Sequence, residues 1–188
     1  MRKRNLCKKV TATILAAALT MTSALTGMMS APLQVAAASS YENANLLVNP
    51  DFEDSKAFSP AGGSHVGNWF SWQSSSKATG DAQSGNGFVK FTGGDSALEQ
   101  DLEGSSLIPG MTYVYTVWAR LSGTTTQEHI IGVKNYGGAE VKQQITSTEW
   151  EKYEIEFVYI SGNPRVYGYV GTHAGVDMYM DNASVTVK

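Results

Sequence analysis

The sequence has very little cysteine and histidine. Its one cysteine, Cys7, lies at the extreme N-terminus, so the rest of the chain has no thiol for a disulfide, a nucleophile or a metal. The three histidines, His65, His129 and His173, are scattered and lack the His-x-x-x-His spacing of a zinc site. No G-x-S-x-G motif is present. These absences argue against the common hydrolase patterns that depend on zinc, a cysteine or an activated serine.

Positive charge is also scarce beyond the first ten residues. Five of the 14 Lys and Arg residues lie there, whereas all 17 Asp and Glu residues follow residue 38. The remaining chain therefore has nine basic residues against 17 acidic ones, a net charge of −8, and it contains no basic run. Nucleic acids and anionic membranes are poor partners for such a surface. A neutral polymer or a cation fits better.

Only the N-terminus contains a long apolar run. The basic stretch MRKRNLCKKV precedes the apolar TATILAAALTMTSALTGMM, and small residues follow as far as Ala38. This order predicts a secretory signal peptide over residues 1–38, a secreted extracellular protein and no membrane contact after cleavage. A membrane anchor is the alternative, because the run is marginally long enough to span a bilayer. Residues 39–44 are expected to form a short linker.

Residues 45–188 show the pattern of a single all-β domain. Segments rich in Val, Ile, Tyr, Phe, Trp and Thr alternate with clusters of Gly, Ser and Asn every 8–15 residues. The expected strands are 45–48, 68–72, 87–92, 97–102, 111–121, 128–135, 140–146, 150–160, 164–171 and 178–187. About ten short strands in one domain predict a two-sheet antiparallel β-sandwich, or jelly roll.

Two of these segments predict which side chains face the core. In YEIEFVY, Tyr153, Ile155 and Phe157 share one face of the strand. In TYVYTVWAR, the alternation separates Val117 from Trp118. One face of each strand is expected to be core, and the other to meet water or a ligand.

Six motifs occur in the order seen in one family of binding domains. They are NLLVNPDFE, GNWFSW, ALEQDLEGSSLIPGMTYVYTVWAR, IIGVKNYGGAEV, TEWEKYEIEF and MYMDNASVTV. Together they resemble the β-sandwich carbohydrate-binding modules of the related families four, nine, sixteen and twenty-two, over essentially all of residues 44–188. Two features depart from the family pattern. No segment of the sequence is expected to form the catalytic domain that usually accompanies such a module, and Asp181-Asn182 stands where two adjacent acids are usual.

The resemblance implies a structural calcium ion. Its side-chain ligands would be Glu53, from the first motif, and Asp181, from the last, with backbone carbonyls near the N-terminus and in the SGNG loop. Calcium prefers six to eight oxygen ligands, which such segments can supply. The alternative is that both carboxylates are solvated at the sheet edge.

Exposed aromatic residues are the expected ligand-binding groups, because aromatic faces match the C–H faces of sugar rings. Trp69 and Trp72 should face opposite sides of their strand, with Trp72 free. In PRVYGYVG, Val166 and Val170 suit the core, which leaves the alternate residues facing outward, with Lys134 and Tyr136 of GVKNYGG as possible neighbours. The predicted ligand-binding residues are Trp72, Trp118, Tyr136, Arg165, Tyr167 and Tyr169.

The sequence thus predicts a secreted, monomeric, non-catalytic module that binds a polysaccharide or oligosaccharide through an aromatic-lined face. One alternative is an adhesion or protein-interaction sandwich that does not bind sugar. The other is a small glycan-cleaving enzyme, which would need two carboxylates about 5–10 Å apart across the sugar.

Overall fold

The computed structural model describes residues 44–54, 58–59, 65–172 and 175–188. The predicted signal peptide, nearly all of the predicted linker and His173 lie outside these residues. None of the helices in the described part is long and apolar enough to cross a membrane. The described chain forms eleven strands and one 3₁₀ turn, Gly104–Ser106.

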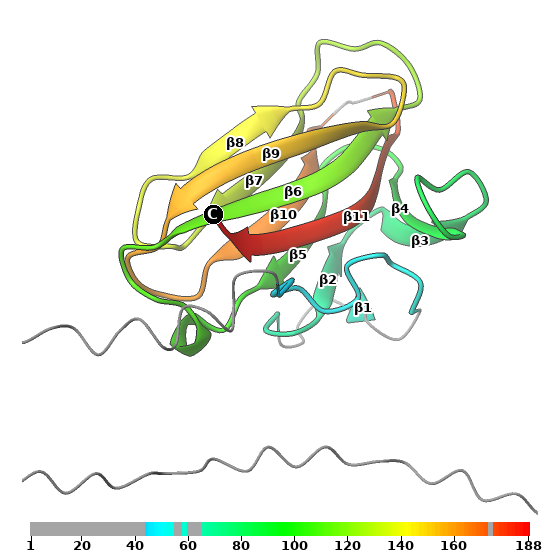
Figure 1. The fold of residues 1–188 in the computed structure, drawn as a ribbon. Helices are drawn as coiled ribbons and strands as arrows, with labels where there is room; N and C mark the ends of the chain where they lie inside the picture. The colour runs from blue at the N-terminus through cyan, green and yellow to red at the C-terminus, as the bar shows by residue number, and fades with distance from the viewer. Residues whose placement is uncertain (1–43, 55–57, 60–64, 173–174) are drawn as a thin grey trace, which may run out of the picture. The chain divides into compact units, whose positions relative to one another are not determined.

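The strands form two sheets, and nearly all of their pairings are antiparallel (Figure 1). The six-stranded sheet has the order β1-β2-β5-β10-β7-β8, and the five-stranded sheet has the order β3-β4-β11-β6-β9. All pairings between the described strands are antiparallel except that of β1 with β2. The strands are β1 Phe58–Ser59, β2 Trp69–Trp72, β3 Ser75–Thr79, β4 Gly87–Phe91, β5 Ser96–Asp101, β6 Thr112–Leu121, β7 His129–Lys134, β8 Val141–Gln144, β9 Glu151–Val158, β10 Arg165–Val170 and β11 Met178–Val187.

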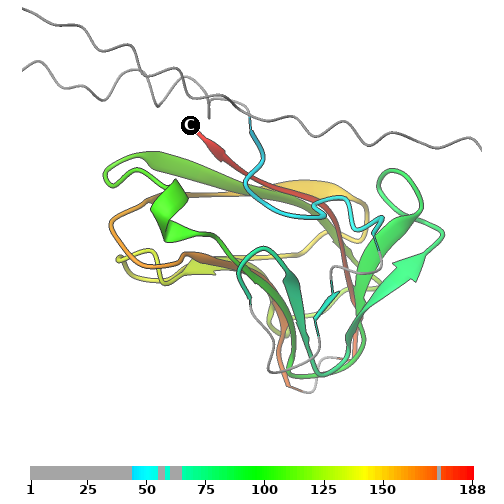
Figure 2. The ribbon, with the colours of Figure 1, turned by 90° about the horizontal axis from the view of Figure 1, so that it is seen from below.

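The two sheets pack face to face as a sandwich, and the two layers are seen edge-on in Figure 2. In several strands, inward-facing residues build the core and alternate with outward-facing ones. In β9, Tyr153, Ile155 and Phe157 are buried, whereas the residues between them are exposed. In β10, Val166 and Val170 are fully buried. The predicted all-β sandwich is confirmed, and so are the predicted core faces of these strands.

The first described segment is not a regular strand, contrary to the expectation for residues 45–48. Leu46 donates its N–H to the carbonyl of Val185 in β11, as a strand residue would. The neighbouring backbone groups are satisfied by side-chain amides instead. Asn45 accepts the N–H groups of Leu47 and Val185, and buried Gln100 bonds both the N–H and the carbonyl of Val48. These amides take the place of a strand ladder.

Two strands were not expected from the sequence. β3 has the polar sequence SSKAT and lies at the edge of its sheet, where it pairs only with β4. An edge strand of this kind has no apolar alternation to reveal it, because tertiary pairing rather than side-chain burial defines it. β1 has two residues and pairs in parallel with β2.

Replacing Tyr115 with phenylalanine should stabilise the fold. The Tyr115 hydroxyl is fully buried and has no hydrogen-bond partner among the described residues, and burial raises its pKa. An unsatisfied buried hydroxyl costs about 1–3 kcal/mol, so we expect a melting temperature several degrees higher, at about 2–4 °C per kcal/mol. Tyr113→Phe is the matched control. The Tyr113 hydroxyl accepts the Ile108 N–H at 3.0 Å, so this variant should melt lower. A lower melting temperature for Tyr115→Phe, measured by calorimetry, would contradict the prediction.

Candidate functional site

The candidate site is the outer face of the six-stranded sheet. Residues that are paired across neighbouring strands project from the same side of a sheet. One such row crosses the six-stranded sheet from β2 to β8. It consists of Trp72 on β2, Ala97 on β5, Tyr169 on β10, Ile130 on β7 and Gln144 on β8. The row places two aromatic rings and two apolar side chains along one line across the strands.

Trp72 and Tyr169 are the accessible aromatic residues of this row. Trp72 is 48% exposed, whereas Trp69 is fully buried, so the predicted division of the two tryptophans is confirmed. Tyr169 is half-buried, and its hydroxyl donates to Asp95 at 3.1 Å. Burial, followed by this hydrogen bond, raises the pKa of Tyr169. Gln73 also donates to Asp95, at 3.2 Å, so Asp95 connects Tyr169 to the residue that follows Trp72.

Two hollows lie along the row. One, of about 260 Å³, extends over β7 and β8 and includes Glu128, Ile130 and Lys142 in its lining. The other, of about 290 Å³, lies towards β2 and includes Phe70, Trp72 and Asp95. Both are also lined by Ala97, Glu99, Lys134 and Tyr169. Together they form an open groove with an aromatic and apolar floor and polar walls.

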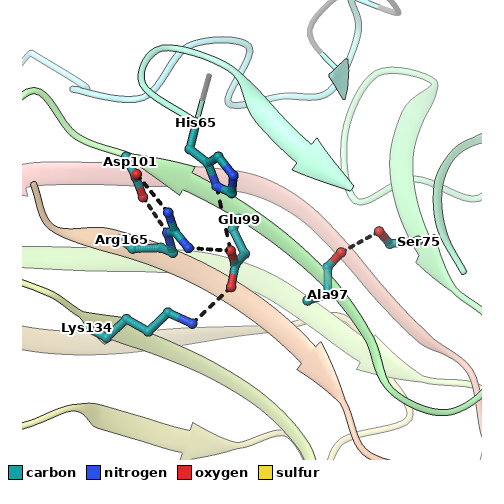
Figure 3. Close-up of polar contacts among 7 residues, drawn as sticks. All are labelled: His65, Ser75, Ala97, Glu99, Asp101, Lys134 and Arg165. Carbon is teal, nitrogen blue, oxygen red and sulfur yellow. Dashed lines mark hydrogen bonds and ion pairs between the residues drawn. The ribbon is translucent and has the colours of Figure 1, made fainter. Parts of the chain in front are cut away.

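Arg165 lies on this face, as predicted, but its guanidinium is already occupied. It donates to both carboxylate oxygens of Asp101, at 2.5 and 2.9 Å, and to Glu99 at 2.9 Å (Figure 3). The hydrogen bonds to Asp101 are the main reason that the pKa of Arg165 is raised. Figure 3 also shows Lys134 and His65 pointing towards Glu99. In this arrangement Arg165 holds the acidic wall in place and is not free to bind a ligand.

Tyr167 also projects from this face, but it is covered. Only 4% of the residue is exposed. Its ring lies against Gly132 on β7, so closely that a Cβ on Gly132 would clash with the tyrosine Cζ. Its hydroxyl donates to Glu140 at 2.7 Å, and the Lys134 Nζ lies 4.9 Å from the ring centroid. The expectation that Tyr167 is exposed is therefore wrong.

Trp118 lies on the outer face of the other sheet. Its strand, β6, belongs to the five-stranded sheet, where Trp118 pairs with Asp181 of β11 and Lys152 of β9. The prediction that Trp118 points away from the core is correct. The grouping of Trp118 with Arg165 and its neighbours is wrong, because the two sets project from opposite sides of the sandwich.

Tyr136 lies in the core, so its expected place on the ligand face is wrong. It is 7% exposed and packs on Phe157, with ring centroids 5.3 Å apart. β7 ends at Lys134, and Asn135 adopts a positive φ of 61°. This left-handed residue breaks the strand alternation and turns the next side chain inward.

Several acidic residues of the groove were not singled out from the sequence. Glu99 accepts from Lys134 at 3.0 Å, Glu128 accepts from Lys142 at 2.9 Å, and Glu140 accepts from Tyr167. The alternation Ala97, Glu99, Asp101 in SALEQD could have revealed the outward acids of β5. The register that sets them beside β10 depends on long-range pairing, which no local pattern encodes.

The two predicted calcium ligands converge on one loop. Glu53 Oε1 accepts the N–H groups of Asn86 and Gly87, both at 2.7 Å. Asp181 Oδ2 accepts the N–H groups of Gln83 and Ser84 at 2.9 and 3.0 Å. The loop between β3 and β4 thus bridges a carboxylate near the start of the domain and one near its end.

The electrostatics of these two carboxylates differ. Hydrogen bonds from Gly87 and then Asn86 lower the pKa of Glu53. Burial raises the pKa of Asp181, and the nearby Glu53 charge adds to that rise. Asp181 is fully buried, and its described hydrogen bonds all come from backbone N–H groups rather than from a cation.

These residues fit a calcium ion, which takes oxygen ligands and would offset a buried carboxylate beside a second acid. Asn182 replaces the second acid usual in this position. It donates to Gln83 and Ser84, so it holds the loop instead of adding charge. Among the described residues, no group of three or more His, Cys, Asp and Glu side chains is placed to hold a metal, so a calcium ion here would depend on two carboxylates and on backbone oxygens.

The fold is a two-sheet β-sandwich, and comparison with known proteins places the chain among carbohydrate-binding domains. A family model described as "Carbohydrate binding domain", covering carbohydrate-binding module families 4 and 9, matches residues 44–174. The chain belongs to this family, as the motifs indicated.

A curated relative is the keratan-sulfate endo-1,4-beta-galactosidase of Sphingobacterium multivorum. It is 33% identical over 142 residues, which are 72% of this chain but only 31% of the relative. The chain therefore spans less than a third of that enzyme.

Solved structures share the fold. A family 61 carbohydrate-binding module, in complex with β-1,4-galactotriose, has a TM-score of 0.57 at 21% identity and covers 78% of this chain and all of its own. A family 4 module has a TM-score of 0.52 at 17% identity, with 76% and 99% of the two chains covered.

Proposed function

We propose that the protein is a secreted, non-catalytic carbohydrate-binding module that binds a polysaccharide along the outer face of the six-stranded sheet. The observation that carries the proposal is the groove between Trp72 and Ile130, which crosses Tyr169 and has polar walls. Aromatic side chains offer large, rigid contact surfaces at low entropy cost. The carboxylates and amides at its edges can bond hydroxyl groups.

Galactose-containing glycans are the first ligands to test. The curated relative acts on keratan sulfate as an endo-1,4-β-galactosidase, and one solved neighbour binds β-1,4-galactotriose. The sequence similarity to the enzyme covers only part of it, so its whole activity need not reside in this domain. Linear β-1,4-galactan is therefore the natural first polymer, with β-glucan, xylan and mannan beside it.

The groove acids support binding rather than hydrolysis. A glycosidase needs one carboxyl group as an acid and a second as a base or nucleophile. Here Glu99 is bonded to Lys134 and Arg165, Glu128 to Lys142, and Glu140 to Tyr167. Acids held in such pairs are poorly placed to exchange protons with a substrate. Bound calcium would act as a structural ion between Glu53 and Asp181, away from this face.

Binding to a polysaccharide panel tests the proposal. Native affinity electrophoresis of residues 39–188 should show retardation by at least one of the four polymers. Binding should be weak, because a few sugar units bury little area and their hydroxyls must first shed water. The same polymers, incubated with the protein, should release no reducing ends. Free migration in every gel would refute the binding function. Steady release of reducing ends, abolished by changing one groove acid, would show an enzyme instead.

A further inference from the structure

The ion pair between Lys134 and Glu99 crosses the proposed groove above the sheet surface. Lys134 on β7 reaches over β10 to Glu99 on β5, with an Nζ–Oε1 distance of 3.0 Å. The side chain of Glu99 is 15% exposed and that of Lys134 is 33% exposed. Arg165 binds the other oxygen of Glu99 at 2.9 Å, which fixes the acid in position (Figure 3).

This ion pair lies on top of Tyr167. Because Tyr167 already lies flat over Gly132, the Lys134 ammonium 4.9 Å from its ring adds a second layer above the sheet. The result is an outward-facing aromatic residue that is only 4% exposed. Tyr167 already forms part of the lining of the hollow over β7 and β8, and without Lys134 more of its ring would be accessible to a ligand on the same face as Tyr169.

The ion pair also stands between the two hollows. Lys134 and Glu99 line both of them, and so do Tyr169 and Ala97. A chain that runs from the Trp72 side of the sheet to the Ile130 side must therefore cross β10 either over Tyr169 or over the ion pair. Tyr169 offers an aromatic platform, whereas the Glu99 carboxylate of the ion pair is already bonded to Lys134 and Arg165.

Displacing the ion pair is unfavourable for a ligand. Breaking this partly buried pair removes one of the two cations that neutralise the Glu99 carboxylate, whose side chain is only 15% exposed. Neutral sugar hydroxyls are poor substitutes for a carboxylate as the partner of the Lys134 ammonium. A ligand that breaks the ion pair therefore gains little binding free energy. A bound polysaccharide chain is therefore confined to the space above Tyr169 where it crosses β10.

From this geometry we infer that the Lys134–Glu99 ion pair determines ligand specificity. It narrows the groove so that unsubstituted polysaccharide chains pass over Tyr169, while chains with sugar side branches on the crossing unit are excluded. The inference rests on the proposed function of the face. It assigns Lys134 and Glu99 a role in selecting the substitution pattern of the glycan.

The test compares matched polymers with and without side branches. The pairs are linear β-1,4-galactan with arabinogalactan, mannan with galactomannan, xylan with arabinoxylan, and β-glucan with xyloglucan. In the pair that wild type binds, the branched polymer should bind at least about tenfold more weakly, a difference of about 1.4 kcal/mol. Lys134→Ala should bring the two dissociation constants to within about threefold, because the crossing then widens onto Tyr167. Lys134→Gln serves the same purpose if the alanine variant does not fold.

Lys90→Ala is the matched control. Lys90 likewise pairs with an acid, Asp177, at 2.9 Å and lies 5.9 Å from the ring of Tyr179, but on the five-stranded sheet. The Lys90→Ala variant should keep the wild-type ratio of the dissociation constants for the branched and unbranched polymers. Equal binding of both polymers by wild type, or an unchanged ratio in folded Lys134→Ala, would overturn the inference while leaving polysaccharide binding intact. If wild type bound neither member of any pair, the proposed function itself would fail and this inference with it.

Discussion

Calcium added to chelator-treated protein should raise the melting temperature by about 8–16 °C. A ligand that binds only the folded state at a thousandfold excess over its Kd stabilises that state by about 4 kcal/mol. For a domain of about 150 residues, this corresponds to about 2–4 °C per kcal/mol. The effect should be large here because Asp181 is fully buried beside a second acid, and a divalent cation would offset both charges.

Substitutions separate this effect from general salt stabilisation. Glu53→Gln removes one of the two converging carboxylates and should abolish most of the calcium response. Glu103→Gln removes an exposed acid elsewhere and should leave the response unchanged. Magnesium, which requires a tighter octahedral site, should stabilise less than calcium. Identical melting curves with chelator and with calcium would show that the two carboxylates are held by the loop alone.

Loss of the Tyr169 ring should weaken polysaccharide binding by at least about tenfold, or about 1.4 kcal/mol. Among the described residues, Tyr169 is the one side chain that lines both hollows and offers an accessible aromatic face. Tyr169→Ala would remove the platform at the point where a bound chain crosses β10. Tyr169→Phe keeps that platform but loses the bond to Asp95, so it should retain most of the affinity. Titration calorimetry with the polymer that wild type binds measures the affinity of each variant. Equal affinities for wild type and Tyr169→Ala would contradict the prediction.

The sequence was sufficient to predict most strands and their inward faces. β9 alternates cleanly, so the pattern alone correctly places Ile155 in the core, and the valines of β10 were likewise correctly placed there. Trp72 could likewise be assigned to the outside of its strand. These are local properties, because the period of two in a strand depends only on neighbouring residues.

The grouping of side chains across strands could not be predicted in the same way. Trp118 and Tyr169 both point outward, yet β6 and β10 belong to different sheets. Sheet membership depends on pairings between residues far apart in the chain, and alternation carries no information about them. The turn at Asn135 had a related effect, because a single left-handed residue reversed the expected direction of Tyr136.

Alternation along a strand also could not predict how accessible an outward-facing side chain is. Tyr167 points outward as expected, but Gly132 on the adjacent strand lets its ring lie flat, and Lys134 covers it. Arg165 also points outward, but Asp101 on the other adjacent strand occupies its guanidinium. In both cases the cross-strand neighbour, and not the strand itself, decides what a ligand can reach.

The most direct test of the proposed binding face compares two tryptophan substitutions on opposite sides of the sandwich. Trp72→Ala removes a 48% exposed ring from the groove, and Trp118→Ala removes a half-buried ring from the outer face of the other sheet. Affinity for the polysaccharide that wild type binds should fall at least about tenfold in the first and stay at the wild-type value in the second, with both variants folded by calorimetry. Loss of binding in Trp118→Ala with retention in Trp72→Ala would place the site on the five-stranded sheet and contradict the account.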